Sequence, residues 1–165
     1  MKLYVMRHGP AEDGADSGDD GDRALTVPGR QRVREVARVL VEVGEEPAEI
    51  ITSPLVRAVQ TAEIVAVDTK LGDRGGSVRT RRELSPGGPI AQLARRIASQ
   101  GRKRVMFVGH EPDLSGLVSS LLGKSFGQGF DKAGVVGLHV SADTGHGRLR
   151  FVLDPRSLEL ERPPR

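Results

Sequence analysis

The sequence contains no cysteine among its 165 residues. Disulfide bonds, thiolate nucleophiles and cysteine-ligated zinc or iron–sulfur sites are therefore excluded. Aromatic residues are also scarce, with four Phe, one Tyr and no Trp. Because proteins that bind single-stranded nucleic acid stack the bases on aromatic side chains, this scarcity argues against such a binding platform.

Long hydrophobic runs are missing as well. The apolar start of the chain, residues 1–6, lasts only a few residues before Arg7 and His8. It is too short for the apolar region of a signal peptide or for a membrane span. We therefore predict a cytoplasmic protein with no membrane partner. The length predicts one domain that covers residues 1–165.

The basic residues are unbalanced in type. The formal net charge is only +3, but the 25 basic residues comprise 20 Arg and 5 Lys. Arginine binds anions through a planar fork that matches phosphate and carboxylate groups. Nucleic-acid-binding proteins carry a basic stripe or a known module, whereas arginines here alternate with acids along the chain. No nucleic-acid partner is predicted, and the arginine excess reflects either a phosphate-sized ligand or composition alone.

Short apolar strands alternate with amphipathic helices along the chain. Strands are predicted at residues 3–6, 49–52, 79–84, 105–108, 135–140 and 149–153, and helices at 28–43, 54–67, 90–99 and 112–122. Thr26 is expected to cap the first helix and Ser53 the second. The alternation predicts an α/β fold. We expect a single-domain three-layer sandwich, with a mostly parallel central sheet, helices on both faces and an antiparallel C-terminal hairpin.

Distinctive residues follow three of the predicted strands. These segments are Arg7-His8-Gly9, Thr52-Ser53-Pro54 and Gly109-His110-Glu111. In a parallel sheet, ligands bind beyond the carboxyl ends of the strands, so the three segments are expected to converge. Arg57 lies near the start of the second helix and can point toward the same crevice.

Each of these residues has an ordinary explanation when it is taken alone. A lone histidine is usually a buried, hydrogen-bonded residue, and a lone helical arginine usually lies on the surface. Two histidines and two arginines at one crevice are harder to attribute to packing. Two guanidinium groups and one imidazole can hold three charged oxygens of a phosphoryl group, while the other imidazole attacks phosphorus.

Six segments together suggest a family. They are MRHGPAE at 6–12, RALTVPG at 23–29, ITSPLVRAVQTAEIV at 51–65, RRELSPGG at 81–88, VGHEPDLS at 108–115 and KAGVVGL at 132–138. In this order they resemble the histidine phosphatase (phosphoglycerate mutase-like) superfamily, and more narrowly its short SixA-type phosphohistidine phosphatases. The resemblance extends over nearly the whole chain.

The resemblance implies a role for each matched position. His8 matches the nucleophile that becomes transiently phosphorylated, and water then hydrolyses the phosphohistidine. Arg7 and Arg57 match the arginines of the phosphate pocket, and His110 matches its second histidine. His8 must attack with one ring nitrogen unprotonated while a neighbour holds the other N–H. No metal and no cofactor are expected.

The sequence leaves open whether a general acid takes part in the reaction. Glu83 lies where some branches of the superfamily carry an acid, and it is interpreted as an acid or as a residue at the pocket edge. The ordinary explanation is a residue that orients Arg7 or Arg57. The segment before His110 lacks the long helical insertion of larger relatives. Short SixA-type members are implied to work without a strong acid, since an imidazole is a better leaving group than an alkoxide.

Other polar residues are given simpler roles. Lys132 is expected to be structural or to face solvent. Ser53 is interpreted as a helix cap. The run at 12–22, which contains six acids, is predicted to be a solvated loop.

Two functions use the same chemistry. The first is removal of phosphate from phosphohistidine on a signalling protein, such as a phosphotransfer domain, because the missing insertion predicts an open pocket. The alternative is hydrolysis of a small phosphate ester. A third hypothesis, from another class, is a non-catalytic phosphate- or nucleic-acid-binding module, and it depends on the isoelectric point near 9.7.

Overall fold

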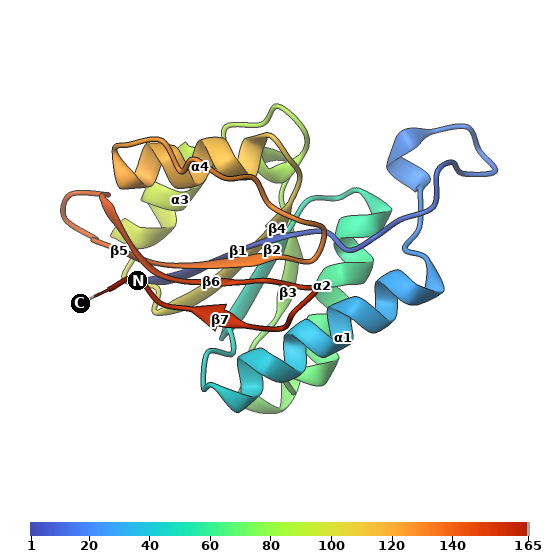
Figure 1. Cartoon of the computed structure of the whole chain (residues 1–165). Helices are drawn as coiled ribbons and strands as arrows, with labels where there is room; N and C mark the ends of the chain where they lie inside the picture. Colours follow the sequence, from blue (N-terminus) through green and yellow to red (C-terminus); the bar gives the residue numbers. More distant parts are fainter. Residues whose placement is uncertain (165) are drawn as a thin grey trace.

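The computed structural model describes residues 1–164, which form a seven-stranded mixed sheet with helices on both faces (Figure 1). The strands lie in the order β3-β2-β4-β1-β5-β6-β7. They are β1 (Lys2–Arg7), β2 (Glu49–Thr52), β3 (Val78–Thr80), β4 (Arg104–Gly109), β5 (Val135–Val140), β6 (Gly147–Leu153) and β7 (Leu160–Glu161). The helices are α1 (Val27–Glu42), α2 (Val56–Asp68), α3 (Ile90–Ser99) and α4 (Asp113–Leu122). This architecture confirms the predicted α/β sandwich.

Four of the strands run parallel, so their carboxyl ends meet at one edge of the sheet. β1 pairs with β4, β4 with β2, and β2 with β3. Arg7 at the end of β1 is level with Gly109 at the end of β4. The residues that follow these strands are therefore neighbours, and the His8 N–H donates to the Gly109 carbonyl at 3.1 Å.

The other half of the sheet is antiparallel. β5 pairs with β1, and β5 and β6 form the predicted hairpin. β7 lies outside the predicted strands and pairs with β6 through residues 160–161. A two-residue strand is too short to show the apolar alternation on which strand prediction depends.

Side chains of β1 alternate between two cores. Leu3 and Val5 pack with residues of α3 and α4, whereas Tyr4 and Met6 pack with residues of α1 and α2. Figure 1 shows these helix pairs on opposite sides of the sheet. Because helices cover both faces, the central strands are apolar throughout rather than alternating with polar residues.

The helix boundaries follow the predictions, with two differences near the carboxyl edge. The Thr26 hydroxyl accepts from the Gly29 N–H at 2.9 Å and caps α1 as predicted. α2 begins at Val56, and its capping position is Leu55 rather than Ser53. Extended chain is predicted up to residue 84, but Arg82–Leu84 forms a 3-10 turn (η3). This turn allows Leu84 to enter the α3/α4 core.

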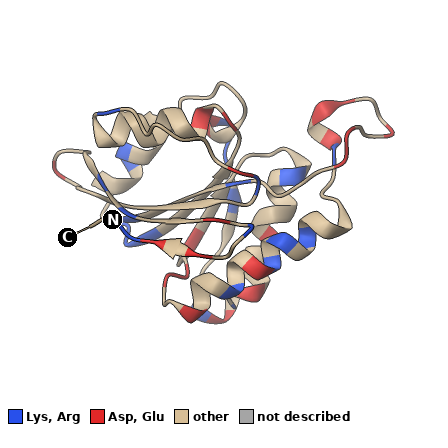
Figure 2. Ribbon diagram, in the orientation of Figure 1, with Lys and Arg blue, Asp and Glu red and all other residues tan. Residues whose placement is uncertain are grey.

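Charged residues are distributed unevenly over the molecule. Figure 2 shows Lys and Arg on many elements, while acids gather in the loop that carries the short 3-10 turn η1 (Asp20–Asp22). In the part of the chain that the structure describes, no helix is both long and apolar enough to cross a bilayer.

A buried carboxylate stabilises the sheet at the end opposite the carboxyl edge. The Glu45 side chain is 5% exposed and accepts hydrogen bonds from Tyr4 Oη, at 2.8 Å, and from both terminal nitrogens of Arg150. Burial alone would raise the pKa of Glu45, but the hydrogen bonds from Arg150 and Tyr4 lower it to about 2. Glu45 therefore stays ionised and connects α1 to β1 and β6.

We expect Glu45→Gln to lower the free energy of unfolding by about 3 kcal/mol, because it leaves the partly buried Arg150 guanidinium without its counter-charge. Glu46→Gln is the matched control, since Glu46 is more exposed and pairs with Arg104 at 3.5 Å. Its expected cost is below about 1 kcal/mol. Urea unfolding followed by circular dichroism measures both variants.

Acidification tests the same contact. The folded-state pKa of Glu45 lies below its ordinary value of 4.5, so its stabilisation is present above pH 4.5 and is lost as the pH falls toward about 2. The wild type should therefore lose more stability than Glu45→Gln over that interval. Parallel acid profiles for the two proteins would contradict this role.

Candidate active site

The carboxyl ends of β1 and β4 bring the two predicted histidines together. The rings of His8 and His110 have centroids 5.3 Å apart and planes inclined at 51°. Both side chains are buried. Arg7 and Arg57 lie close enough for their positive charges to lower the pKa of both rings. The structure thus gathers all four residues that the motifs single out.

His8 has one ring nitrogen engaged by the backbone. Its Nδ1 lies 2.7 Å from the Gly9 carbonyl oxygen. A carbonyl oxygen only accepts, so Nδ1 carries the proton and Nε2 keeps its lone pair. Burial is the main cause that lowers the pKa of His8 to about 3; the Gly9 hydrogen bond opposes it, and the nearby His110, Arg57 and Arg7 add to it. The ring is therefore neutral at neutral pH.

His110 is held by a residue with an unexpected role. Its Nε2 lies 2.8 Å from Ser53 Oγ, and this oxygen also accepts from the Leu55 N–H at 3.2 Å. Burial and the charge of Arg57 lower the pKa of His110 to about 4, while Asp113 and Asp20 act in the opposite direction. Ser53 is therefore not the simple helix cap of the sequence interpretation. It joins the end of β2 to the ring that follows β4.

Each of the two arginines donates hydrogen bonds to a single residue of the described chain. Arg7 Nη1 donates to the Phe130 carbonyl at 2.8 Å. Arg57 is 5% exposed, and its Nη1 and Nη2 donate to the carbonyl and the carboxylate of Asp20 at 2.9 and 3.1 Å. These contacts use the terminal nitrogens and leave the Nε–H groups to other partners.

Three buried polar nitrogens belong to this cluster. Arg7 Nε, Arg57 Nε and His110 Nδ1 have no hydrogen-bond partner within residues 1–164. A buried N–H without a partner is costly, and such groups in native structures often mark a ligand site. Two guanidinium charges beside neutral imidazoles make this a site for an anion.

Close packing holds the segment around His8. The Gly9 N–H donates to Thr61 Oγ1 at 3.0 Å, and the Thr61 hydroxyl donates to the Arg57 carbonyl at 2.7 Å. A Cβ atom at Gly9 would lie 2.7 Å from Val33 Cγ2, so α1 allows no side chain there. Thr61 thus couples the nucleophile segment to Arg57, and its place within ITSPLVRAVQTAEIV is the one signal that could have identified it.

Glu83 forms its ion pair outside the cluster. It lies in η3 and pairs with Arg96 at 2.9 Å. A backbone hydrogen bond and the Arg96 guanidinium lower the pKa of Glu83, so the carboxyl is ionised at neutral pH and holds no proton to donate. Among the described residues, no hydrogen bond or ion pair connects Glu83 to Arg7, Arg57 or either histidine. Lys132 is exposed, but the N–H of the next residue, Ala133, donates to the Arg7 and His8 carbonyls.

The acidic loop is solvated as predicted, but one of its residues also reaches the site. The Asp20 side chain is exposed, yet it contacts Arg57 and influences the pKa of His110. The sequence prediction does not include this pairing. The reason is that a loop side chain can pair with a residue 37 positions later, and local sequence does not reveal such a pairing.

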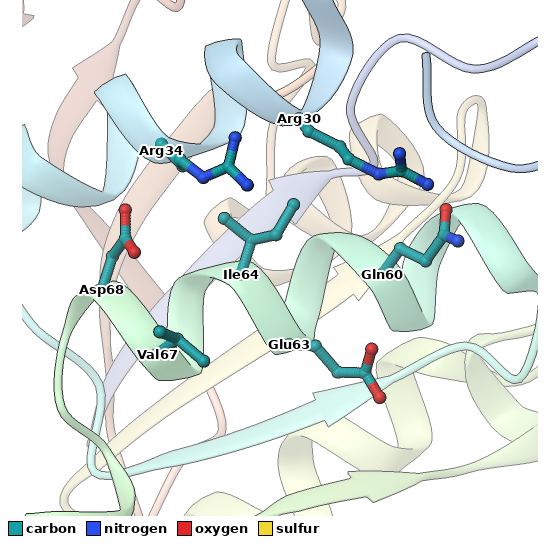
Figure 3. Close-up of a pocket in the computed structure, with 7 residues that line it drawn as sticks. All are labelled: Arg30, Arg34, Gln60, Glu63, Ile64, Val67 and Asp68. Carbon is teal, nitrogen blue, oxygen red and sulfur yellow. The ribbon is translucent and has the colours of Figure 1, made fainter. Parts of the chain in front are cut away.

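A separate groove lies between α1 and α2. It has a volume of about 330 Å³ and is lined by Arg30, Arg34, Gln60, Glu63, Ile64, Val67 and Asp68. Figure 3 shows Arg34 extending from α1 toward Ile64 of α2, and Arg30 extending toward Gln60. The groove carries charges of both signs and contains no histidine, the type of nucleophile that the sequence motifs predict. Nowhere in residues 1–164 do three or more His, Asp or Glu side chains form a metal-binding group.

Comparisons with known proteins agree with the geometry. Residues 3–84 match the model of the histidine phosphatase superfamily (branch 1). An uncharacterised protein of Picosynechococcus sp. (strain PCC 7002) is 40% identical over 151 residues, which cover 86% of this chain and 87% of that protein. The phosphohistidine phosphatase SixA of Escherichia coli K12 is 26% identical over 163 residues, covering 97% of this chain and 98% of the relative.

Solved structures share the fold over nearly the whole chain. A protein histidine phosphatase SixA, solved in complex with tungstate, has a TM-score of 0.87 and 26% identity, covering 96% of this chain and all of that one. A phosphoserine phosphatase from Entamoeba histolytica is similar in fold, with a TM-score of 0.69 at 19% identity, over 96% of this chain and 99% of that one.

We expect the imidazoles of His8 and His110 to stay neutral down to about pH 5, because their pKa values are lowered from 6.5 to about 3 and about 4. Nitrogen-15 shifts of the ring atoms, followed during acid titration, measure this directly. The urea-unfolded protein is the control, in which both rings should titrate near 6.5.

The same shifts predict how stability depends on pH. Because the folded-state pKa values are the lower ones, the unfolded state takes up protons first when the pH falls below 6.5. The two rings therefore destabilise the fold on acidification and have no such effect above that pH. Ring signals that titrate near 6.5 in the folded protein would contradict the prediction.

Proposed function

The chain belongs to the histidine phosphatase superfamily and is a phosphatase, and we propose that it acts through a phosphohistidine formed on His8. The observation that carries the proposal is the state of this ring. Its Nδ1–H is bound to a carbonyl and its pKa is about 3, so Nε2 holds a lone pair at neutral pH. A neutral imidazole in a fixed orientation is suited to nucleophilic attack.

The pocket binds the phosphoryl group through charged and neutral donors. Arg7 and Arg57 direct guanidinium N–H groups to the non-bridging oxygens, and His110 adds an imidazole N–H. In the tautomer that supplies this N–H, the Ser53 hydroxyl donates to His110 Nε2 and the proton lies on the buried Nδ1. Donors that are already in place when charge develops on the oxygens lower the barrier without reorganisation.

Hydrolysis proceeds in two displacements. His8 Nε2 attacks phosphorus, and the bond to the leaving atom breaks, with its electron pair going to that atom. A water oxygen then attacks the phosphorus atom of phospho-His8, the phosphorus–nitrogen bond breaks, and the water protons remain on the phosphate or pass to solvent. Nε2 recovers its lone pair and inorganic phosphate leaves. The arginines stabilise the equatorial oxygens in both displacements.

Phosphohistidine on a protein is the substrate that this site fits best. The leaving group is then an imidazole, which needs little help from a general acid. The pairing of Glu83 with Arg96, and its lowered pKa, support a mechanism without a strong acid at that position. The similarity to phosphohistidine phosphatase SixA supports the same substrate class. We propose a phosphotransfer domain of a signalling protein as the partner.

A small phosphate ester is the second candidate substrate. The fold is shared with a phosphoserine phosphatase, whose substrate has an alkoxide leaving group. That chemistry needs a proton donor, so Glu83 would have to leave Arg96 and take up a proton. The two candidates therefore differ in how strongly they depend on Glu83.

We expect His8→Ala to lower turnover by more than about 10³-fold, because it removes the attacking atom. Incubation of the wild type with a ³²P-labelled phosphohistidine protein, followed by rapid quenching, should trap label that is labile to acid and stable to alkali. His146→Ala is the matched control, since His146 is exposed in the turn before β6. Label that persists on His8→Ala would overturn the assignment.

The substrate class is tested with a panel of phosphohistidine protein, free phosphohistidine and alkyl phosphates. We expect the phosphohistidine protein to be hydrolysed fastest, and Glu83→Gln to change that rate by less than about 3-fold. Faster cleavage of alkyl phosphates, together with a loss of about 10²-fold or more in Glu83→Gln, would favour the second candidate.

A further inference from the structure

The acidic loop reaches the phosphate pocket through one residue. Asp20 belongs to η1, and its side chain is 66% exposed, yet it contacts an Arg57 side chain that is 6% exposed. Its carbonyl accepts from Nη1 and its carboxylate from Nη2. Two hydrogen bonds from one residue restrict the rotation of the Arg57 guanidinium in its plane.

The two contacts use one end of the guanidinium. A guanidinium has five N–H groups, and Asp20 takes one from each terminal nitrogen. Nε–H is left without a partner in the described chain, and an outer N–H remains on each terminal nitrogen. Asp20 therefore leaves three N–H groups of this guanidinium without a hydrogen bond within residues 1–164, the buried Nε–H among them, and these are the donors that a phosphate could use.

Asp20 is itself held in place. Arg23 Nε donates to Asp20 Oδ1 at 2.9 Å, so the carboxylate bridges two guanidinium groups. Arg23 Nη1 also donates to the Glu12 carbonyl at 2.9 Å. Asp19 stabilises the turn, because its carboxylate accepts from the Gly21 N–H at 2.8 Å. The loop thus has a defined structure where it meets the site.

The carboxylate is unsuited to proton transfer. Hydrogen bonds from Arg23 and the charge of Arg57 lower the pKa of Asp20, so the group stays ionised. The charge of Asp20 raises the pKa of His110, although the larger effect of burial lowers it. Glu83 is not among the main charges that shift this pKa. A permanently ionised group beside a catalytic arginine orients that arginine or competes with the substrate for it.

We propose that Asp20 is a positioning residue that orients the Arg57 guanidinium for the phosphoryl group. The loop at 12–22 is then part of the active site. The proposal rests on the proposed function of Arg57. The arrangement favours orientation over competition because Asp20 uses only two of the five N–H groups of Arg57. The carboxylate also offsets part of the buried positive charge, which keeps Arg57 ordered between turnovers.

The main variant is Asp20→Ala, with Asp20→Asn as a second variant that keeps the size of the side chain. Asp13→Asn is the matched control, because Asp13 is an exposed carboxylate of the same loop that makes none of these contacts. We expect Asp20→Ala to lower kcat by about 10–100-fold and to change KM by less than about 3-fold. Asp20→Asn should lie between it and the wild type, and Asp13→Asn should equal the wild type.

A double-variant cycle separates orientation from general damage to the loop. In an Arg57→Ala background, Asp20→Ala should cost less than about 2-fold, because there is no guanidinium left to orient. Loop damage would instead add its full cost in both backgrounds and would overturn the proposal. Unchanged or increased kcat in Asp20→Ala would also overturn it, since a competing carboxylate would inhibit the wild type.

Calorimetric titration with inorganic phosphate tests the positioning role of Asp20 without measuring turnover. We expect Asp20→Ala to bind phosphate several-fold more weakly than the wild type and Asp13→Asn to bind it equally. Equal or tighter binding by Asp20→Ala would contradict the positioning role. A wild type that binds phosphate in this pattern but forms no phosphohistidine would refute the proposed function and leave the positioning of Arg57 intact.

Discussion

The buried positive charge of Arg57 is the constraint on which the rest of the site depends. A guanidinium cannot lose its proton in a protein, so its charge must be balanced by neighbours. Asp20 supplies one balancing charge from a loop. The neighbouring imidazoles respond by staying neutral, since burial and two arginine charges disfavour a further cation. Burial is the main reason that the nucleophile stays unprotonated, and the charges that bind the phosphoryl group add to this effect.

The sheet supplies the precision that this chemistry needs. Parallel pairing of β1 with β4 sets His8 beside Gly109, and the lack of a side chain at Gly9 brings β1 close to α1. Ser53 and Thr61 then connect β2 and α2 to the two histidine segments. Sites built on strand ends and helix starts hold their groups more tightly than sites built on free loops. Asp20 is the exception, and three side-chain contacts compensate for its place in a loop.

Sequence reasoning succeeds where local pattern carries the information. The apolar runs before Arg7 and His110 mark strands, and strands that alternate with helices imply a shared carboxyl edge. It fails where one side chain meets a distant partner. Asp20 is one of six acids at residues 12–22, and nothing in the sequence of that loop distinguishes the acid that contacts Arg57. Ser53 resembles a helix cap in sequence because capping and histidine binding use the same hydroxyl oxygen, and β7 is too short to show a pattern.

The proposed donors to the phosphoryl group come from three separate parts of the chain, at residues 7, 57 and 110. An oxyanion bound among them would join β1, α2 and the segment after β4, much as a cross-link does, but reversibly. Binding to the folded state alone draws the folding equilibrium toward that state as ligand concentration rises. Substrate and product would therefore act as folding ligands for the parallel half of the sheet. In a cell, the amount of intact protein would then depend on the supply of the anion that it processes.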